Sequence, residues 1–390
     1  MFGTITSEFI DLGGNWQLVL LEFDENEILK RYEIETGKET IGAGQVTTEG
    51  QGLPETNVSS RVLYETSQWK WTRDDTFRDV EFSPDGNLVA AINSDRVLLR
   101  NLETDELREF KPENTSTIFD CAFERDLAFA PDGASLAVLT SDISIVNVAT
   151  LQAVLNFKDH GSSCSWNIRV ARAMAFAPDG KTMASGDFEG VIKVWDPSTG
   201  AVIKSFKAHE GLILSIAFSP DGRLLATSSQ DKDNSVKIWD LSTGKEQAVL
   251  KQHTGIVKFS PIGNILAIHS GPLVEIWEVD SSTSNKAVAN SNQPGRLIDV
   301  IMVPIARPDS GGYLLRPALE FSPDGEWIAA SFGSAIIYDI AARKQVWRFV
   351  PDVTKGEDVI TDLSFSPASK NVLAATSMRK IYLWTLPLKD

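Results

Sequence analysis

A five-residue string recurs through the chain at nearly constant spacing, and this repetition limits the possible folds more than any other feature. The string is written FSPDG three times, FAPDG twice, and FSPIG and FSPAS once each. The seven copies begin at Phe82, Phe129, Phe176, Phe218, Phe259, Phe321 and Phe365. Successive marker phenylalanines are 47, 47, 42, 41, 62 and 44 residues apart. A period of about 40–45 residues is typical of one four-stranded sheet per repeat.

The repeat around Phe218 shows the local pattern most clearly. Apolar and polar residues alternate over four short stretches, which predicts antiparallel strands at 212–219, 223–229, 235–241 and 246–250. Proline presets φ, aspartate bonds to its own backbone and glycine accepts a positive φ, so PDG predicts the turn after the first strand. The marker Phe and the apolar residue two positions before it share one strand face, and we expect both to pack between sheets.

This unit resembles a blade of a WD-repeat β-propeller. Trp239-Asp240 closes the third strand, His209 precedes the first strand, and Asp233 stands six residues before the tryptophan. The resemblance implies a buried hydrogen-bond network within the blade, made by His209, Thr227, Asp233 and Trp239. The preceding repeat offers Ser185, Glu189 and Trp195 at the corresponding positions, with glutamate in place of the usual aspartate.

The resemblance covers most of the chain, although most of its copies are degenerate. When the repeats are aligned on the threonine of the turn after the third strand, the Trp position can be assigned in every repeat. It is occupied by Arg100, Val146, Trp195, Trp239, Trp277, Tyr338 and Trp384. The plain spelling of the repeats leads us to expect a bacterial family member.

We predict an all-β protein with one domain over residues 1–390, a closed β-propeller of four-stranded antiparallel blades. Residues 1–41 align as a degenerate first blade, with Phe9 at the marker position, Tyr32 at the Trp position and Thr36 at the turn position. Residues 42–60 are predicted to form a loop, and 61–390 hold seven clearer repeats with an insertion near 281–312.

An N-terminal strand is expected to complete the last blade, because closure protects the edge strands. If this strand lies near residues 2–8, there are eight blades, which is the number we favour. If it is RVLYE, residues 61–65, there are seven.

Composition narrows the function classes. The formal net charge of -16 argues against bulk binding of nucleic acid. The start of the chain has no signal-peptide pattern, no run reaches about 18 apolar residues, and the two cysteines suggest no disulfide framework, so a cytoplasmic protein without a membrane span is expected. We find no metal-ligand spacing, nucleophile elbow or phosphate loop, and therefore expect no metal, no cofactor and no enzymatic activity.

The candidate binding residues lie four positions before the marker Phe. Three consecutive repeats place arginine there, at Arg78, Arg125 and Arg172. The resemblance implies that this end of strand one lies at the top surface, where partners dock, and guanidinium groups bind carboxylates through paired hydrogen bonds. Structural ion pairs across blades, made with Asp79 and Asp126, are the alternative. Nearby candidates are Trp69, Trp71, Trp166 and Arg316.

We therefore expect a scaffold that docks a protein or peptide with an acidic segment, as a subunit of a larger assembly. A propeller enzyme or a small-ligand sensor that uses the central channel is the alternative function.

Overall fold

The chain forms two compact units, Met1–Thr56 and Asn57–Asp390, where we expected a single domain. The computed structural model describes residues 5–11, 16–23, 29–36, 39–45, 59–65, 76–93, 96–112, 126–140, 142–157, 171–230, 232–279, 295–305, 317–349 and 359–386. Side chains are described from residue 59 onward, except at 171 and 172. In these ranges, no segment is a helix with the length and apolarity needed to cross a membrane.

The first unit is a single antiparallel sheet whose strands pair in chain order. They are β1 (Ile5–Asp11), β2 (Trp16–Phe23), β3 (Leu29–Thr36) and β4 (Glu39–Gln45). Phe9 lies opposite Leu18, which lies opposite Glu35, whereas Tyr32 lies opposite Leu21. Tyr32 therefore does not lie in the same cross-strand row as Phe9. The strand β4 ends at Gln45, so its last residues fall in the segment 42–60 that was predicted to be a loop.

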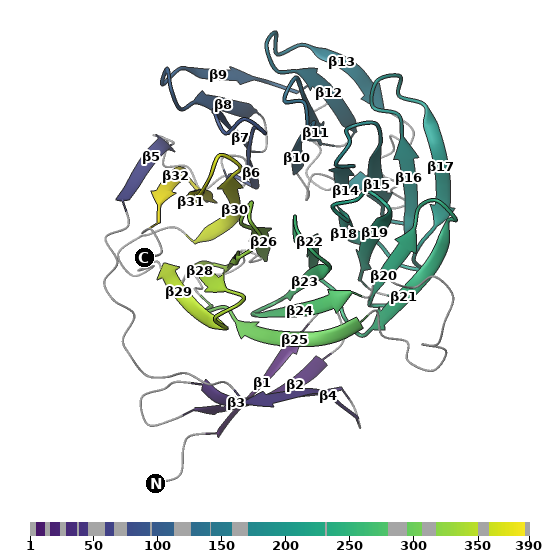
Figure 1. Ribbon diagram of the computed structural model, residues 1–390, viewed down its shortest axis with the longest axis vertical. Helices are drawn as coiled ribbons and strands as arrows, with labels where there is room; N and C mark the ends of the chain where they lie inside the picture. Colours follow the sequence, from purple (N-terminus) through teal and green to yellow (C-terminus); the bar gives the residue numbers. More distant parts are fainter. Residues whose placement is uncertain are drawn as a thin grey trace. The chain divides into compact units, whose positions relative to one another are not determined.

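The described residues of the second unit form seven four-stranded sheets arranged around a central axis (Figure 1). Blades 1 to 3 are β6 (Asp79–Phe82), β7 (Leu88–Ile92), β8 (Val97–Asn101), β9 (Leu107–Phe110); β10 (Asp126–Phe129), β11 (Ser135–Leu139), β12 (Ile143–Asn147), β13 (Ala153–Phe157); and β14 (Ala171–Phe176), β15 (Met183–Asp187), β16 (Val191–Trp195), β17 (Val202–Lys207). Blades 4 and 5 are β18 (Ile213–Phe218), β19 (Leu224–Ser229), β20 (Ser235–Asp240), β21 (Lys245–Lys251); and β22 (Ile256–Phe259), β23 (Ile265–Ser270), β24 (Leu273–Val279), β25 (Gly295–Met302). Blades 6 and 7 are β26 (Ala318–Phe321), β27 (Trp327–Phe332), β28 (Ser334–Asp339), β29 (Lys344–Phe349); and β30 (Ile360–Ser366), β31 (Ser369–Ser377), β32 (Lys380–Thr385), β5 (Ser59–Glu65).

The propeller has seven blades, so the prediction of eight was wrong. The strand at the start of the chain, β1, pairs with β2 in the separate first unit. The fourth strand of blade 7 is β5, which contains RVLYE and pairs with β32 from Thr385↔Ser59 to Lys380↔Glu65. Leu63 of this strand is buried in the cluster between blades 7 and 1.

The strands of blade 4 confirm the pattern expected from the sequence, and the Trp positions are confirmed in all seven blades. In each blade the marker Phe, one residue of the second strand and the residue at the Trp position lie in one cross-strand row, as in Phe218↔Leu225↔Trp239. The predicted insertion at 281–312 was too long, because residues 295–302 form β25, the fourth strand of blade 5.

The core lies between the blades. The buried apolar residues that the structure describes form seven clusters, each of which joins two neighbouring blades. Between blades 7 and 1, for example, Phe82 and Val80 pack with Ala374 and Ile381. This confirms that the marker Phe and the apolar residue two positions before it pack between sheets.

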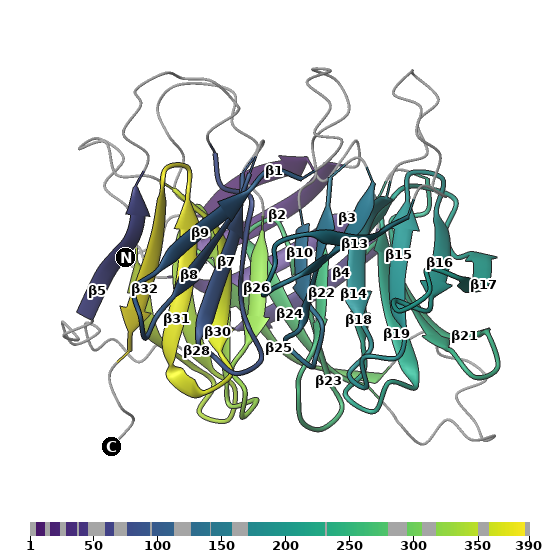
Figure 2. The same cartoon turned by 90° about the horizontal axis from the view of Figure 1, so that it is seen from above.

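The repeated PDG turns contact one another from blade to blade. The turn glycines Gly86, Gly133, Gly180 and Gly222 have φ values between 67° and 75°, as the sequence predicted. A Cβ atom added to Gly133 would lie 3.6 Å from Pro84 of the preceding blade, and one added to Gly180 would lie 3.4 Å from Pro131. The proline of one turn therefore rests against the glycine of the next. Figure 2 shows the strands of the blades from the side, with the connecting turns at their ends.

Removal of the first unit should leave the propeller intact, whereas removal of β5 should not. We expect a chain of residues 57–390 to unfold cooperatively at nearly the full-length denaturant midpoint. A chain of residues 67–390 lacks the β5–β32 hydrogen bonds and buried Leu63, and should lose about 3 kcal/mol or more of unfolding free energy. Urea titrations followed by tryptophan fluorescence measure both. Equal stability of the two truncated chains would contradict closure by β5.

Candidate functional site: the blade networks and the inner strands

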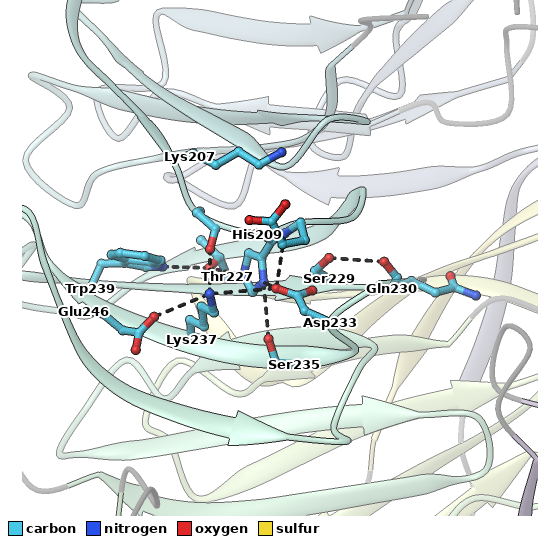
Figure 3. A network of polar contacts seen from close by, with 12 residues as sticks. Lys207, His209, Thr227, Ser229, Gln230, Asp233, Ser235, Lys237, Trp239 and Glu246 are labelled. Carbon is cyan, nitrogen blue, oxygen red and sulfur yellow. Dashed lines mark hydrogen bonds and ion pairs between the residues drawn. The ribbon is translucent and has the colours of Figure 1, made fainter. Parts of the chain in front are cut away.

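Blade 4 contains a continuous buried network of polar side chains (Figure 3). Trp239 Nε1 donates to Thr227 Oγ1 over 2.9 Å, and the same oxygen lies 2.8 Å from His209 Nε2. His209 Nδ1 lies 2.9 Å from Asp233 Oδ2. The network therefore connects the second and third strands of the blade to the segments before β18 and before β20.

Electrostatics fixes the charge state of this network. Burial alone would raise the pKa of Asp233, but the hydrogen bond and charge of His209 outweigh it and lower that pKa to about 2. Lys237 Nζ donates to Ala208 O over 2.9 Å and lies 3.8 Å from Asp233 Oδ2. Asp233 is thus held as a carboxylate, and we expect the network to stabilise the blade.

Blade 3 has a shorter version of the same arrangement. Trp195 Nε1 donates to Ser185 Oγ over 2.7 Å. Glu189 is exposed, whereas Asp187 is buried and its Oδ1 accepts the N–H groups of Glu189 and Val191. A role for Glu189 in a blade network stays a prediction.

In blades 3 and 4 the aspartate after the Trp orders the turn between the third and fourth strands. Asp240 Oδ1 accepts the N–H of Thr243 over 2.9 Å, and Asp196 Oδ1 accepts the N–H of Ser198 over 2.9 Å. These local bonds create an Asx turn, the short loop that asparagine and aspartate favour. The Trp-Asp pair therefore joins a cross-strand row to the turn that follows it.

The predicted arginine cluster lies mostly outside the described residues. Arg78 directly precedes β6 and is half-buried, and its N–H donates to Ile92 O over 2.9 Å. Arg172 lies in β14, but only its backbone is described. Arg125, Trp69, Trp71, Trp166 and Arg316 lie outside the described residues. The choice between partner binding and structural ion pairs therefore stays open for this cluster.

A second set of polar residues lies on the inner strands one and three positions before the marker Phe, and our sequence analysis named only Asp79 and Asp126 of this set, as possible partners of the arginines. The inner strand of each blade is an edge strand, so alternate N–H groups have no strand partner. Asp362 Oδ2 in blade 7 accepts the N–H of Val80 in blade 1 over 2.9 Å, and Asp79 accepts the N–H of Leu127 in blade 2. The residue three positions before one marker thus caps an N–H of the next inner strand.

The residue one position before the marker has the same role. Glu81 Oε2 accepts the N–H of Phe129 over 2.8 Å, and Ser364 Oγ accepts the N–H of Phe82 over 3.2 Å. The sequence alone could have identified this set, because the positions one and three before each marker Phe can be read from it. The polar residues at these positions are Asp79, Glu81, Asp126, Ser215, Lys258, Glu320, Asp362 and Ser364.

The carboxyl groups of blades 7, 1 and 2 are close enough to share protons. Asp79 is hydrogen-bonded to the side chains of both Asp126 and Asp362. Burial, and then the proximity of Asp79, raise the pKa of Asp126 and of Asp362 well above their usual range. Burial and Asp79 likewise raise the pKa of Glu81. One bond between two such carboxyl groups requires a proton on one of them.

Lys258 is the only cation at these inner-strand positions, all of which the structure describes. Its Nζ lies 2.9 Å from Glu320 Oε2, and the charge of Glu320 raises the pKa of Lys258. Among the side chains that the structure describes, no group of three or more His, Cys, Asp or Glu residues is arranged to hold a metal ion. The inner carboxyl groups are therefore explained by their bonds to the adjacent blade.

Thr227→Val should weaken the propeller, because it leaves Trp239 Nε1 and His209 Nε2 buried without their common partner. We expect a loss of about 2–3 kcal/mol in the free energy of unfolding, measured by urea titration. Thr243→Val removes the hydroxyl of an exposed turn and is the matched control. A loss no larger than that of the control would show that the network does not stabilise the blade.

Asp362→Asn should flatten the dependence of stability on pH. A raised folded-state pKa adds stability that is complete below the usual aspartate pKa of about 3.9 and is lost as pH rises through the folded value. Asparagine keeps an oxygen for Val80 N–H but cannot ionise. Between pH 8 and pH 5 the wild type should therefore gain more unfolding free energy than the variant.

Asp221→Asn provides a contrast, because the hydrogen bond from Ser219 lowers the pKa of this exposed turn residue. The contribution of Asp221 to the free energy of unfolding is present above the usual pKa of aspartate and is lost only in stronger acid. The change in unfolding free energy caused by Asp221→Asn should therefore be constant between pH 8 and pH 5. If the free energy of unfolding depended on pH equally in the wild type and in Asp362→Asn, this would contradict the shared protons.

Comparisons with known proteins agree with this architecture. The family described as "WD domain, G-beta repeat" (WD40) matches residues 152–196 and 200–240. Each match begins near the fourth strand of one blade and ends with the third strand of the next, so one sequence repeat joins two blades.

Curated relatives match over limited stretches. Apoptotic protease-activating factor 1 of Danio rerio is 44% identical over 48 residues, 12% of this chain and 4% of that protein. p21-activated protein kinase-interacting protein 1-like of Xenopus laevis is 27% identical over 115 residues, 30% of this chain and 31% of that protein. WD40 repeat-containing protein HOS15 of Arabidopsis thaliana is 40% identical over 45 residues, 12% of this chain and 7% of that protein.

The chain spans less than a third of each of these relatives. All three are eukaryotic, so they do not support the expected bacterial origin. The family match falls on the two blades that carry the Trp-Asp pairs, and the remaining blades repeat the same cross-strand row around the ring. Residues 152–196 and 200–240 thus match the WD40 repeat family, and they lie within a seven-bladed β-propeller.

Proposed function

We propose that the propeller is a non-catalytic scaffold that docks a protein or peptide with an acidic segment. WD40 propellers are typical protein-interaction scaffolds, and one matched relative is named for its interaction with a protein kinase. The docking surface is the end of the ring at which the inner strands of blades 1 to 3 begin.

The observation that carries this proposal is that the marker phenylalanines of the first three blades occupy the same cross-strand row. Arg78, Arg125 and Arg172 each stand four positions before their marker in the sequence, and the β14–β15 register shifts at Arg172, between Ala171 and Ala173. Their inner strands β6, β10 and β14 are consecutive around the axis (Figure 1). Guanidinium groups at such spacing suit a row of carboxylates.

Charge reversal at the three arginines tests the proposal. The variant with Arg78, Arg125 and Arg172 changed to Glu should bind a fluorescent oligoglutamate peptide at least about tenfold more weakly, because charge-assisted hydrogen bonds contribute about 1.5–3 kcal/mol each. Fluorescence anisotropy measures binding, and the melting temperature should stay unchanged.

The matched control changes Arg108, Arg296 and Arg348 to Glu. These residues lie on the fourth strands β9, β25 and β29, and their replacement alters the net charge by the same amount. Equal weakening by both variants would indicate only a general charge effect. Unfolding of the first variant would show that the arginines are structural, and would reject this docking surface.

A further inference from the structure

Blade 5 retains the Trp of the blade network but lacks the residue that binds it in blade 4. Trp277 lies opposite Leu266, as Trp239 lies opposite Leu225. Ile268 stands opposite Val257, in the place that Thr227 occupies opposite Ile216. An isoleucine side chain offers no oxygen to the Trp277 indole.

Glu275 supplies the missing acceptor from a different position. Its Oε2 accepts the hydrogen bond of Trp277 Nε1 over 3.0 Å and lies 2.9 Å from His253 Nδ1. The imidazole of His253 stands edge-to-face against Trp277, with ring centroids 5.8 Å apart. In blade 4 the position of Glu275 is held by Lys237, so the two blades place opposite charges at this point.

The surroundings of His253 make Glu275 its controlling partner. Both side chains are 16% exposed. Burial lowers the pKa of His253, but the charge and hydrogen bond of Glu275 outweigh burial and raise it above the usual value. Lys258 is paired with Glu320, and Asp299 Oδ2 accepts the hydroxyl of Tyr338 over 2.6 Å.

Two other titratable groups stand on the strands that flank or contact this segment. Lys251, at the end of β21, is exposed. The buried His269 on β23 donates its Nδ1–H to Ala318 O over 3.0 Å, and burial lowers its pKa to about 4, which leaves it neutral. Neither group opposes the attraction between His253 and Glu275.

His253 belongs to the short segment 252–255 that joins β21 to β22. The C-terminal end of this segment is held through the backbone of Gly255, because Gly255 O accepts a hydrogen bond from Ser228 Oγ over 2.5 Å. A Cβ atom on Gly255, whose φ is 130°, would lie 2.1 Å from His269 O. Two residues earlier in the segment, His253 contacts Glu275 of β24.

We propose that His253 and Glu275 form a proton-dependent latch that holds segment 252–255 against β24. When His253 carries a proton, the ion pair closes the segment. When the proton leaves, the neutral imidazole can still donate one N–H to the Glu275 carboxylate, but the attraction between opposite charges is lost and the segment opens more readily.

The latch lies at the end of blade 5 at which the inner strand begins. Arg78 stands at the corresponding end of blade 1, directly before β6. The latch therefore gives this end of the propeller a response to pH that does not depend on the proposed docking function.

The direction of the pH effect follows from the raised pKa. The stabilisation is complete below the usual histidine value of about 6.5 and is lost as pH rises through the folded value. Each unit by which Glu275 raises the pKa changes the closing equilibrium about tenfold.

NMR titration and hydrogen exchange test the latch. The chain has four histidines, and His253→Gln identifies the resonance of His253. In the wild type this resonance should titrate above about 6.5, and in Glu275→Gln it should titrate at lower pH. Glutamine retains an oxygen for Trp277 Nε1–H but removes the charge.

Exchange of segment 252–257, corrected for the intrinsic rate, should rise between pH 6 and pH 8.5 by about tenfold per unit of pKa shift. This rise should disappear in Glu275→Gln. The exchange rates of segment 208–213 in blade 4 should be the same in the wild type and in Glu275→Gln. If Glu275→Gln does not fold, His253→Gln applies the same test, because it leaves the Glu275–Trp277 bond in place. A His253 resonance at or below the usual pKa, or an unchanged pH dependence of exchange in the variants, overturns the proposal.

Discussion

The ring depends on side chains of one blade that complete the inner edge of the next at several of its junctions. An inner strand has a paired side and an open side, and an unsatisfied N–H on the open side costs about 1–3 kcal/mol once it is buried. In the part of the chain that the structure describes, Asp362, Asp79 and Glu81 cap such groups across blades 7, 1 and 2, and Ser215 caps Val257 N–H between blades 4 and 5. The apolar clusters between blades add most of the buried surface, while these polar bonds fix the register of one blade against another.

The junctions are built from different residues although the repeats look alike. Tyr338 takes the Trp position of blade 6 and donates to Asp299 on the fourth strand of blade 5, whereas Trp239 in blade 4 donates to a threonine of its own blade. Glu275 replaces that threonine in blade 5. In blades 5 and 6 the residue at the Trp position therefore keeps a hydrogen bond although the blade departs from the pattern of blade 4.

The sequence predicted the local features well and the long-range pairing poorly. The PDG turns, the strands of blade 4 and the seven Trp positions depend on residues close in the chain, and the periodic pattern identified them. The number of blades depends on which distant segment pairs with β32, and Phe9 and Tyr32 imitated a blade without sharing its cross-strand row. The inner carboxyl groups were predictable in principle, because they recur one and three positions before the marker Phe. The pairing of Glu275 with His253 was not, since Glu275 stands at a position that bears lysine in blades 3 and 4.

The offset between sequence repeat and blade has a mechanical consequence. β5 lies at the outer edge of blade 7, is bonded to β32 alone within its sheet, and is reached directly from the first unit along the chain. A pull on residues 1–56 is therefore transmitted to β5 before any other strand of the ring. Tension applied there would peel one strand from blade 7 and open the circle, while blades 1 to 6 kept all of their strands. Tension on the first unit would therefore act on the strand that closes the ring.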